Sequence, residues 1–149
     1  MADAYFAMGC FWKPETVFRH VSGVTDVTVG YSGGTKEQPT YRQVCAGGTG
    51  HAEAVYVQFD PERVTYARLL TVFWNNHHYG FGERTAAQAT DQYRSAIFTV
   101  GGQAEEAEAS RAERESGRSR QIVTVIEPLQ QFWPAEEYHQ RYMEKAGRA

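Results

Sequence analysis

Apolar residues recur along the chain at two spacings, which together predict five strands and three helices. Residues 4–8 form a continuous apolar run, which is typical of a buried strand. Val27, Val29 and Tyr31 occupy alternate positions, which indicates a strand with one buried face. Between residues 66 and 76 the apolar positions follow a helical spacing instead. The prediction places strands at 4–8, 24–31, 53–60, 95–100 and 122–126, and helices at 14–20, 66–76 and 103–116.

The order of these elements predicts an α+β fold built as a two-layer sandwich. A Gly-rich loop at 32–39 follows the second strand, and an irregular stretch at 77–90 follows the second helix. Loops of this kind often carry binding groups, because connecting segments lie at the surface. No repeat, low-complexity tract or long linker interrupts the pattern, so residues 1–149 are expected to form a single domain.

Composition and net charge argue against two classes of binding partner, nucleic acids and membranes. The net charge is −3 and the arginines are scattered, which offers no basic field for a nucleic acid. No apolar run approaches the roughly 20 residues that cross a membrane, and the N-terminus lacks the pattern of a signal peptide. We therefore expect a cytoplasmic protein without a nucleic-acid or membrane partner. No phosphate loop or dinucleotide fingerprint is present, so no cofactor is expected.

Cys10 is the main candidate for chemistry, because it lies between an apolar strand and a sequence that opens a helix. Gly9 permits a tight turn, and Pro14 suits the first turn of the helix. The partial positive charge at such a helix start would favour the thiolate, which is the reactive form of cysteine. The alternative is a buried, inert cysteine, since free Cys often packs as a small hydrophobic residue.

The second cysteine, Cys45, is expected to be a packed residue rather than a partner of Cys10. Val44 and Ala46 flank it in a segment that has the character of a strand. A reducing compartment would keep both cysteines as thiols. Whether the two sulfur atoms can meet is left open by the sequence.

A metal site is the main alternative interpretation of the histidines. His77 and His78 would be ligands, with His51, Glu53 and His139 as further ones. Adjacent histidines on a strand point to opposite faces, however, and in a loop their directions are unconstrained. Two cysteines at this separation are also too few for a zinc site made of thiolates. We therefore expect no metal.

Glu53 lies in a predicted strand that otherwise buries apolar residues, so burial would raise the pKa of its carboxyl group. A protonated carboxyl group can donate its proton to a leaving oxygen. Taken alone, a single Glu in a strand more often faces solvent, and a single Tyr more often lies at the edge of the core. The residues themselves therefore leave the roles of Glu53, Tyr41 and Tyr93 open.

Four short segments occur in an order and at a spacing typical of one enzyme family. They are Gly9-Cys10-Phe11-Trp12, Pro39-Thr40-Tyr41-Arg42, Gly50-His51-Ala52-Glu53-Ala54-Val55 and Gln92-Tyr93-Arg94-Ser95. Together they resemble the peptide methionine sulfoxide reductase A family, and the similarity extends from about Phe6 to Lys145. The resemblance implies a ferredoxin-like βαβ core with added strands, helices and long loops.

The resemblance also implies an activity, the reduction of methionine (S)-sulfoxide, free or within a peptide, to methionine. Cys10 is expected to attack the sulfoxide sulfur and become a sulfenic acid. Glu53 would act as the acid, while Tyr41 and Tyr93 would bind the sulfoxide oxygen. These four residues are the expected catalytic set.

The expected binding groups follow from the same resemblance. Phe11 and Trp12 would form an apolar wall around the methyl group of the substrate. His51 is expected to serve packing rather than chemistry, and Glu15 the start of the helix or a neighbouring Arg. The expected partners are a sulfoxide substrate and thioredoxin or another thiol reductant.

The chain departs from the family pattern at three places. His77-His78-Tyr79 stands where the family has His-Asp-Pro, and Gln88 replaces an acid that helps to hold substrate. We therefore expect His77, His78 and Gln88 to contact substrate at an altered pocket lip. The printed sequence also ends before the position where many members carry a resolving cysteine. An external thiol or Cys45 would then have to reduce the sulfenic acid.

An altered pocket leaves a second function open. The same scaffold could perform non-redox acid–base chemistry, such as imine or carbon–carbon bond formation on an aromatic small molecule in secondary metabolism. Glu53 and the histidine pair would then move protons, and no thiol turnover would be needed. A non-catalytic binding module is the third interpretation, but it leaves Cys10 unexplained.

Overall fold

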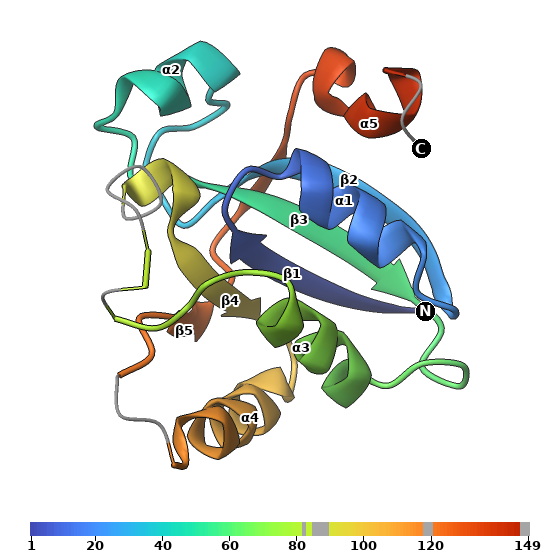
Figure 1. Cartoon of the computed structure of the whole chain (residues 1–149). Coiled ribbons are helices and arrows are strands. Elements are labelled where there is room, and N and C mark those ends of the chain that lie inside the picture. The colour runs from blue at the N-terminus through green and yellow to red at the C-terminus, as the bar shows by residue number, and fades with distance from the viewer. Residues whose placement is uncertain (82, 85–89, 118–120, 147–149) are drawn as a thin grey trace.

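The computed structural model describes residues 1–81, 83–84, 90–117 and 121–146 (Figure 1). The strands are β1 Ala2–Met8, β2 Val24–Ser32, β3 Ala52–Phe59, β4 Ser95–Thr99, β5 Val125–Pro128 and β6 Phe132–Pro134. The α-helices are α1 Trp12–Arg19, α2 Tyr41–Ala46, α3 Tyr66–Asn75, α4 Gln103–Glu115 and α5 Tyr142–Lys145. Two 3₁₀ helices complete the set, η1 Asp91–Tyr93 and η2 Glu137–His139.

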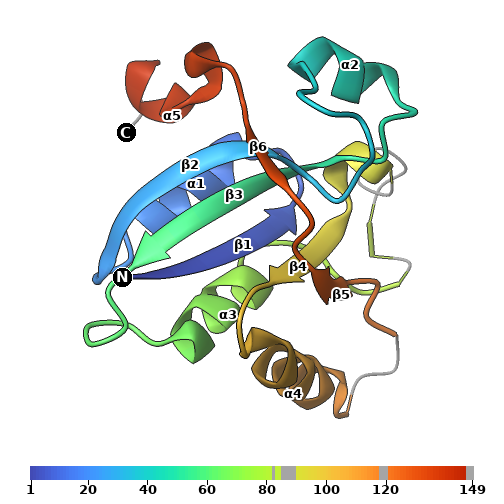
Figure 2. The ribbon, with the colours of Figure 1, turned by 180° about the vertical axis from the view of Figure 1, so that it is seen from behind.

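The strands form one six-stranded sheet in the order β5-β4-β1-β3-β2-β6. Neighbouring strands are antiparallel, except for β4 and β5, which are parallel. Helices α1 and α3 lie on one face of this sheet, in front of it in Figure 1 and behind it in Figure 2. The predicted mixed α+β class is therefore confirmed.

Aromatic packing fills the space between the sheet and these two helices. Alternate residues of β1, namely Ala4, Phe6 and Met8, point to this side because successive side chains of a strand face opposite ways. The Phe6 ring lies 5.2 Å from Phe18 of α1 and 5.2 Å from Phe73 of α3, measured between centroids. A smaller cluster lies on the other face of the sheet and comprises Tyr5, Ala7, Ala52, Ala54, Ala96 and Phe98.

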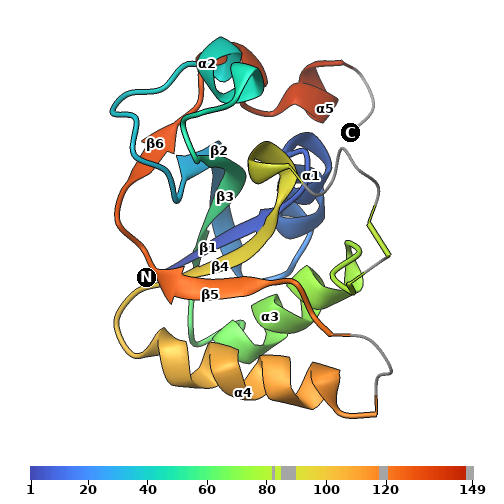
Figure 3. The ribbon, with the colours of Figure 1, turned by 90° about the vertical axis from the view of Figure 1, so that its left-hand side faces the viewer.

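The helix α4 lies alongside α3 at the end of the molecule away from α2 (Figure 3). The Trp74 indole N–H of α3 donates to the Ser110 hydroxyl of α4 over 2.9 Å. Only Ala107 of α4 is buried, which fits the polar composition of this helix. Within the described part of the chain, no helix is long and apolar enough to span a membrane.

The predicted strand around Cys45 is wrong, because this residue lies in the short helix α2. Thr40 caps the helix, since its hydroxyl accepts the Gln43 N–H while the Gln43 side chain accepts the Thr40 N–H. Such a reciprocal cap stabilises the first turn of a helix despite the β-branched Val44. Cys45 is also exposed rather than packed.

The end of the chain differs from the prediction as well. The strand expected at 122–126 begins at Val125, while Ile122 forms an isolated bridge with Gly80. It is also not the last strand, because β6 follows and pairs with β2 at the opposite edge of the sheet. Beyond β6, the Gln140 side chain exchanges two 2.9 Å hydrogen bonds with the backbone of Val29, so it continues the pairing of β2.

A buried carboxylate then ties this last segment to α1. Glu15 is 1% exposed and forms an ion pair with Arg19, one helical turn further on. Both of its carboxylate oxygens also lie 2.9 Å from the backbone nitrogen of Arg141. The last segment of the chain is therefore held beside the N-terminus of α1.

Candidate active site

Cys10 occupies the turn between β1 and α1. Gly9 has a φ of +99°, a conformation that residues with a side chain rarely adopt, and Phe11 is the N-cap of α1. The exposed Cys10 lines a cleft of about 600 Å³ whose walls include His78 and Tyr93. Solvent and a small substrate can therefore reach this sulfur.

The environment of Cys10 favours the thiol in the free protein. Protein packed around the sulfur raises the pKa of Cys10, and the charge of Glu53 adds to the effect. The backbone N–H of Trp12, at the start of α1, acts in the opposite direction but is outweighed. The start of α1 thus favours the thiolate, as expected, but burial and the charge of Glu53 outweigh this effect in the free protein.

Glu53 lies in β3 on the side of the sheet that faces α1. It is 1% exposed, and its cross-strand neighbour is Tyr31 of β2. Burial raises the pKa of Glu53 to about 7, although hydrogen bonds from Gln92 and from the Phe11 N–H oppose the rise. Near neutral pH this carboxyl group can therefore hold a proton and release it.

Gln92 contacts both this carboxyl group and the second cysteine. Its side-chain nitrogen lies 2.6 Å from Glu53 Oε2 and 3.1 Å from Cys45 Sγ. The other carboxylate oxygen, Oε1, accepts the Phe11 N–H over 3.2 Å. Gln92 begins the segment Gln92-Tyr93-Arg94-Ser95, but no role was expected for it. No signal in the residue itself indicated that its amide would join two reactive groups.

Tyr41 and Tyr93 come from separate segments and meet beside Glu53. Both phenols interact electrostatically with Glu53 and with the thiol of Cys45. Burial, and next the nearby acidic groups, raise the pKa of both phenols. Both therefore remain protonated and able to donate hydrogen bonds.

Phe11 and Trp12 contact the last segment of the chain. Phe11 is 1% exposed, and its ring centroid lies 5.2 Å from that of His139. Trp12 stacks on Tyr142 at 3.8 Å and donates its indole N–H to His139 Nδ1 over 3.2 Å. The structure thus joins an aromatic wall to His139, which sequence analysis considered only as a metal ligand.

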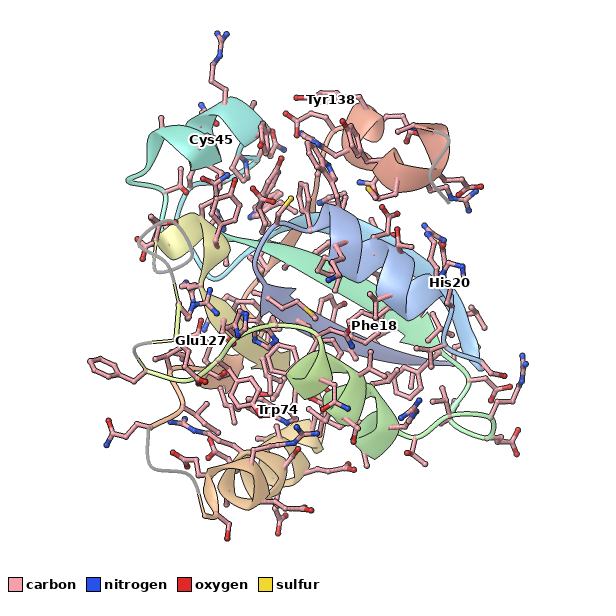
Figure 4. All side chains as sticks on the ribbon, viewed as in Figure 1. Phe18, His20, Cys45, Trp74, Glu127 and Tyr138 are labelled. Carbon is pink, nitrogen blue, oxygen red and sulfur yellow. The ribbon has the colours of Figure 1, made fainter. Side chains whose placement is uncertain are left out.

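Glu136 connects the same last segment to Tyr31 and Tyr41, whose ring centroids lie 5.9 and 6.5 Å from that of Phe11. Its carboxylate accepts the Tyr31 hydroxyl and the Tyr41 backbone N–H, each over 2.9 Å. Burial alone would raise the pKa of Glu136, but these hydrogen bonds outweigh it and lower the pKa. Glu136 therefore stays charged and fixes the start of α2 against β2. Figure 4 shows Cys45 on α2 at the same end of the molecule as the exposed Tyr138.

His77 and His78 have different surroundings, although both line the cleft of Cys10. His77 Nδ1 lies 2.8 Å from the Phe73 carbonyl oxygen and Nε2 2.7 Å from the Ser95 hydroxyl. Burial lowers the pKa of His77 to about 4, so it is neutral near pH 7. His78 is exposed at the cleft, and Gln88 lies outside the described residues.

The proposed metal ligands do not gather at one point. His51 is 2% exposed, accepts the Gly34 N–H at Nδ1 and contacts the Lys36 carbonyl oxygen at Nε2. It therefore holds the loop between β2 and α2. Among the residues that the structure describes, no three His, Cys, Asp or Glu side chains are grouped to hold a metal ion.

Comparisons with known proteins agree on one family. The model of the family described as peptide methionine sulfoxide reductase matches residues 2–148. Peptide methionine sulfoxide reductase MsrA of Methanoculleus marisnigri is 50% identical over an alignment of 147 residues that covers 97% of this chain and 90% of the relative. The reduced form of Mxr1 from Saccharomyces cerevisiae superimposes with a TM-score of 0.86 at 32% identity, covering 99% of this chain and 87% of Mxr1. Mxr1 in complex with Trx2 gives a TM-score of 0.61 at 25% identity, covering 95% and 84%.

Proposed function

Because the chain belongs to the peptide methionine sulfoxide reductase family, we propose that Cys10, Glu53, Tyr41 and Tyr93 are the groups that perform its reaction. That reaction is the thiol-dependent reduction of methionine sulfoxide to methionine. The observation that carries the assignment is the position of Glu53. Its buried carboxyl group, with a pKa near 7, accepts the N–H of Phe11, the residue next to the reactive thiol.

In the proposed first step, the Cys10 sulfur attacks the sulfur of the sulfoxide. The oxygen passes to Cys10, which becomes a sulfenic acid, and the substrate sulfur is reduced to a thioether. Glu53 supplies the proton that the oxygen needs as its negative charge develops. The phenols of Tyr41 and Tyr93 donate hydrogen bonds to the same oxygen.

The protonation of Glu53 also prepares the nucleophile. The negative charge of the Glu53 carboxylate raises the pKa of Cys10. When Glu53 holds a proton, that charge is absent and the Cys10 thiolate becomes easier to form. The same proton therefore makes Glu53 an acid and makes Cys10 a better nucleophile.

The proposed binding groups surround this pair. Phe11 and Trp12 form the apolar wall for the methyl group, and their packing against His139 supports a fixed wall. We assign substrate contacts at the lip to His77, His78 and Gln88. His77 and His78 line the cleft that contains Cys10, which supports the first two.

The partners are a sulfoxide substrate and a thiol reductant. Thioredoxin serves as the reductant, as the complex of the related Mxr1 with Trx2 indicates. We further propose that the protein works in the cytoplasm, and that residues 1–149 form a single domain with a ferredoxin-like core in two layers. The order β4-β1-β3-β2, with α1 following β1 and α3 following β3, supports such a core.

The non-redox alternative is not favoured. It requires the histidine pair to move protons, yet both ring nitrogens of His77 are hydrogen-bonded and its pKa is about 4. It also assigns no role to Cys10 at the mouth of the cleft.

Incubating the protein with N-acetylmethionine sulfoxide and dithiothreitol tests the function. We expect repeated turnover to N-acetylmethionine, with a preference for the S sulfoxide, measured by chiral chromatography. Absence of any thioether product would overturn the proposed function.

A further inference from the structure

We propose that Cys45 is the thiol that resolves the sulfenic acid on Cys10, given that Cys10 reacts with the sulfoxide as described above. The chain contains two cysteines, and both are free and exposed. Cys45 is therefore a second thiol that solvent can reach, and it lies on α2, whereas Cys10 precedes α1.

Cys45 lies on the same face of α2 as a residue that is proposed to bind the substrate oxygen. Tyr41 and Cys45 are four residues apart on this helix, so their side chains are neighbours. The two side chains also interact electrostatically. Cys45 therefore lies beside the proposed oxygen-binding group.

The amide of Gln92 provides a second, independent link. One nitrogen of this side chain is within hydrogen-bond distance of both the Cys45 sulfur and the Glu53 carboxylate. In addition to burial, the charges of Cys10 and of Cys45 both raise the pKa of Tyr93, the next residue in the chain. Both cysteines therefore influence the same set of polar groups.

A disulfide requires the two Cα atoms to lie within about 4.4–6.8 Å of each other, so the proposal requires that Cys45 can approach Cys10 to this distance. Glu136 fixes the start of α2, but the rest of the helix has little buried surface, because Val44 is its one buried residue. Gly47 and Gly48 follow it with φ of +85° and +87°, a region that glycine adopts far more readily than other residues. These two glycines give the backbone after the helix wide conformational freedom.

A second cavity lies beside α2. A cavity of about 250 Å³ is lined by Cys45, Gln92 and Tyr93, and Tyr93 also lines the cleft of Cys10. Tyr93 thus borders the cavities of both cysteines. The proposal requires α2 and the Tyr93 side chain to shift so that the sulfur atoms meet.

The proposed step is balanced. The Cys45 thiol attacks the sulfenic sulfur of Cys10, a sulfur–sulfur bond forms, and the sulfur–oxygen bond of Cys10 breaks. The OH group of the sulfenic acid leaves as water, and the one proton that it takes up is the thiol proton of Cys45, passed directly or through Glu53. The sulfenic sulfur is reduced and the Cys45 sulfur is oxidised. A dithiol reductant of the thioredoxin class then returns both cysteines to thiols.

The test uses the whole chain and one equivalent of sulfoxide without reductant. As methionine forms, we expect both thiols to disappear and peptide mass mapping to find Cys10 joined to Cys45. Dimedone added during the reaction should label almost no Cys10. Dimedone-labelled Cys10 in high yield, with Cys45 still open to alkylation, would overturn the proposal.

The substitution Cys45→Ser separates the formation of the Cys10 sulfenic acid from its later reaction with Cys45. We expect this variant to form as much methionine in a single turnover as the parent chain, to accumulate sulfenic acid at Cys10, and to lose turnover supported by thioredoxin. Ala46→Ser is the matched control, because it adds a hydroxyl group at the neighbouring exposed position of α2 and should change none of these measurements. Unchanged thioredoxin-supported turnover in Cys45→Ser would also overturn the proposal.

Failure of the underlying function gives a different result. If the parent chain forms no methionine with one equivalent of sulfoxide, the proposed function fails, and the role of Cys45 fails with it. If methionine forms but the disulfide does not, only the role of Cys45 fails.

Discussion

Aromatic packing holds the core beneath α1, whereas hydrogen bonds between distant segments hold the site at the start of the same helix. In the core, Phe6 and Phe18 stack with ring planes inclined by only 3°. In the site, Glu53 of β3 accepts hydrogen bonds from Phe11 and from Gln92, which are 42 and 39 residues away along the chain. Changes in the core should therefore alter stability, and changes in the site should alter chemistry.

Glu53→Gln should give the largest effect on the reaction. The amide cannot deliver a proton, and general acid catalysis is typically worth about 10² to 10⁴ in rate. Rapid-quench measurement of methionine in a single turnover provides the rate. The exposed Glu62→Gln is the control and should react normally. A loss below about threefold would remove Glu53 from the role of acid.

Phe18→Ala should give the largest effect on stability. Phe18 is fully buried between the sheet and α1, and removal of such a ring typically costs about 3–5 kcal/mol. Urea unfolding measures the change, and Phe18→Leu, which keeps most of the volume, should lose much less. At a temperature where the variant remains folded, its single-turnover rate should stay close to that of the parent. A large loss of rate in the folded variant would contradict the separation of core and site.

Glu15→Gln should affect both regions to a smaller extent, because Glu15 joins α1 to the last segment. The amide keeps one acceptor oxygen but loses the charge, and a hydrogen bond to a charged group contributes about 1.5–3 kcal/mol. We expect lower stability to urea, and a higher KM with a smaller change in kcat, since the segment carries His139 against the aromatic wall. The exposed Glu144→Gln is the control. Equal effects of the two substitutions would refute the anchoring role of Glu15.

Gln92→Ala should give the smallest effect, a shift in pH dependence. The hydrogen bond from Gln92 lowers the pKa of Glu53, which burial raises to about 7, so its loss should raise that pKa further. Because a carboxyl group above its pKa has no proton to donate, the decline of the single-turnover rate at high pH should begin at a higher pH in the variant. A shift of this decline to lower pH would contradict the direction stated here.

The core and the site also differ in how much of their structure could be predicted from the sequence. The core strands and helices lie close to their predicted positions, because each has a clear apolar period within a short window, as at Val27, Val29 and Tyr31. The helix α2 was missed because it depends on the reciprocal cap between Thr40 and Gln43 rather than on an apolar period.

Cys10 could be predicted from its position at the start of a helix, whereas the roles of the other site residues could be predicted only through family resemblance. The four short segments indicated Glu53, Tyr41 and Tyr93 beside Cys10, and the structure brings these residues to one end of the sheet. The contributions of Gln92, Glu136 and His139 depend on contacts between segments that are far apart in the chain. No local pattern of polarity encodes such contacts, so they required the three-dimensional structure.

Cys10 is the residue proposed to carry the redox chemistry. The most direct test measures methionine formed per chain in a single exposure to excess sulfoxide without reductant. The parent chain should form about one methionine per chain, and Cys10→Ser should form none, because a hydroxyl group is far less ionised and less nucleophilic than a thiol. Circular dichroism should show the same fold for both chains. Formation of methionine by folded Cys10→Ser at the level of the parent chain would contradict the account.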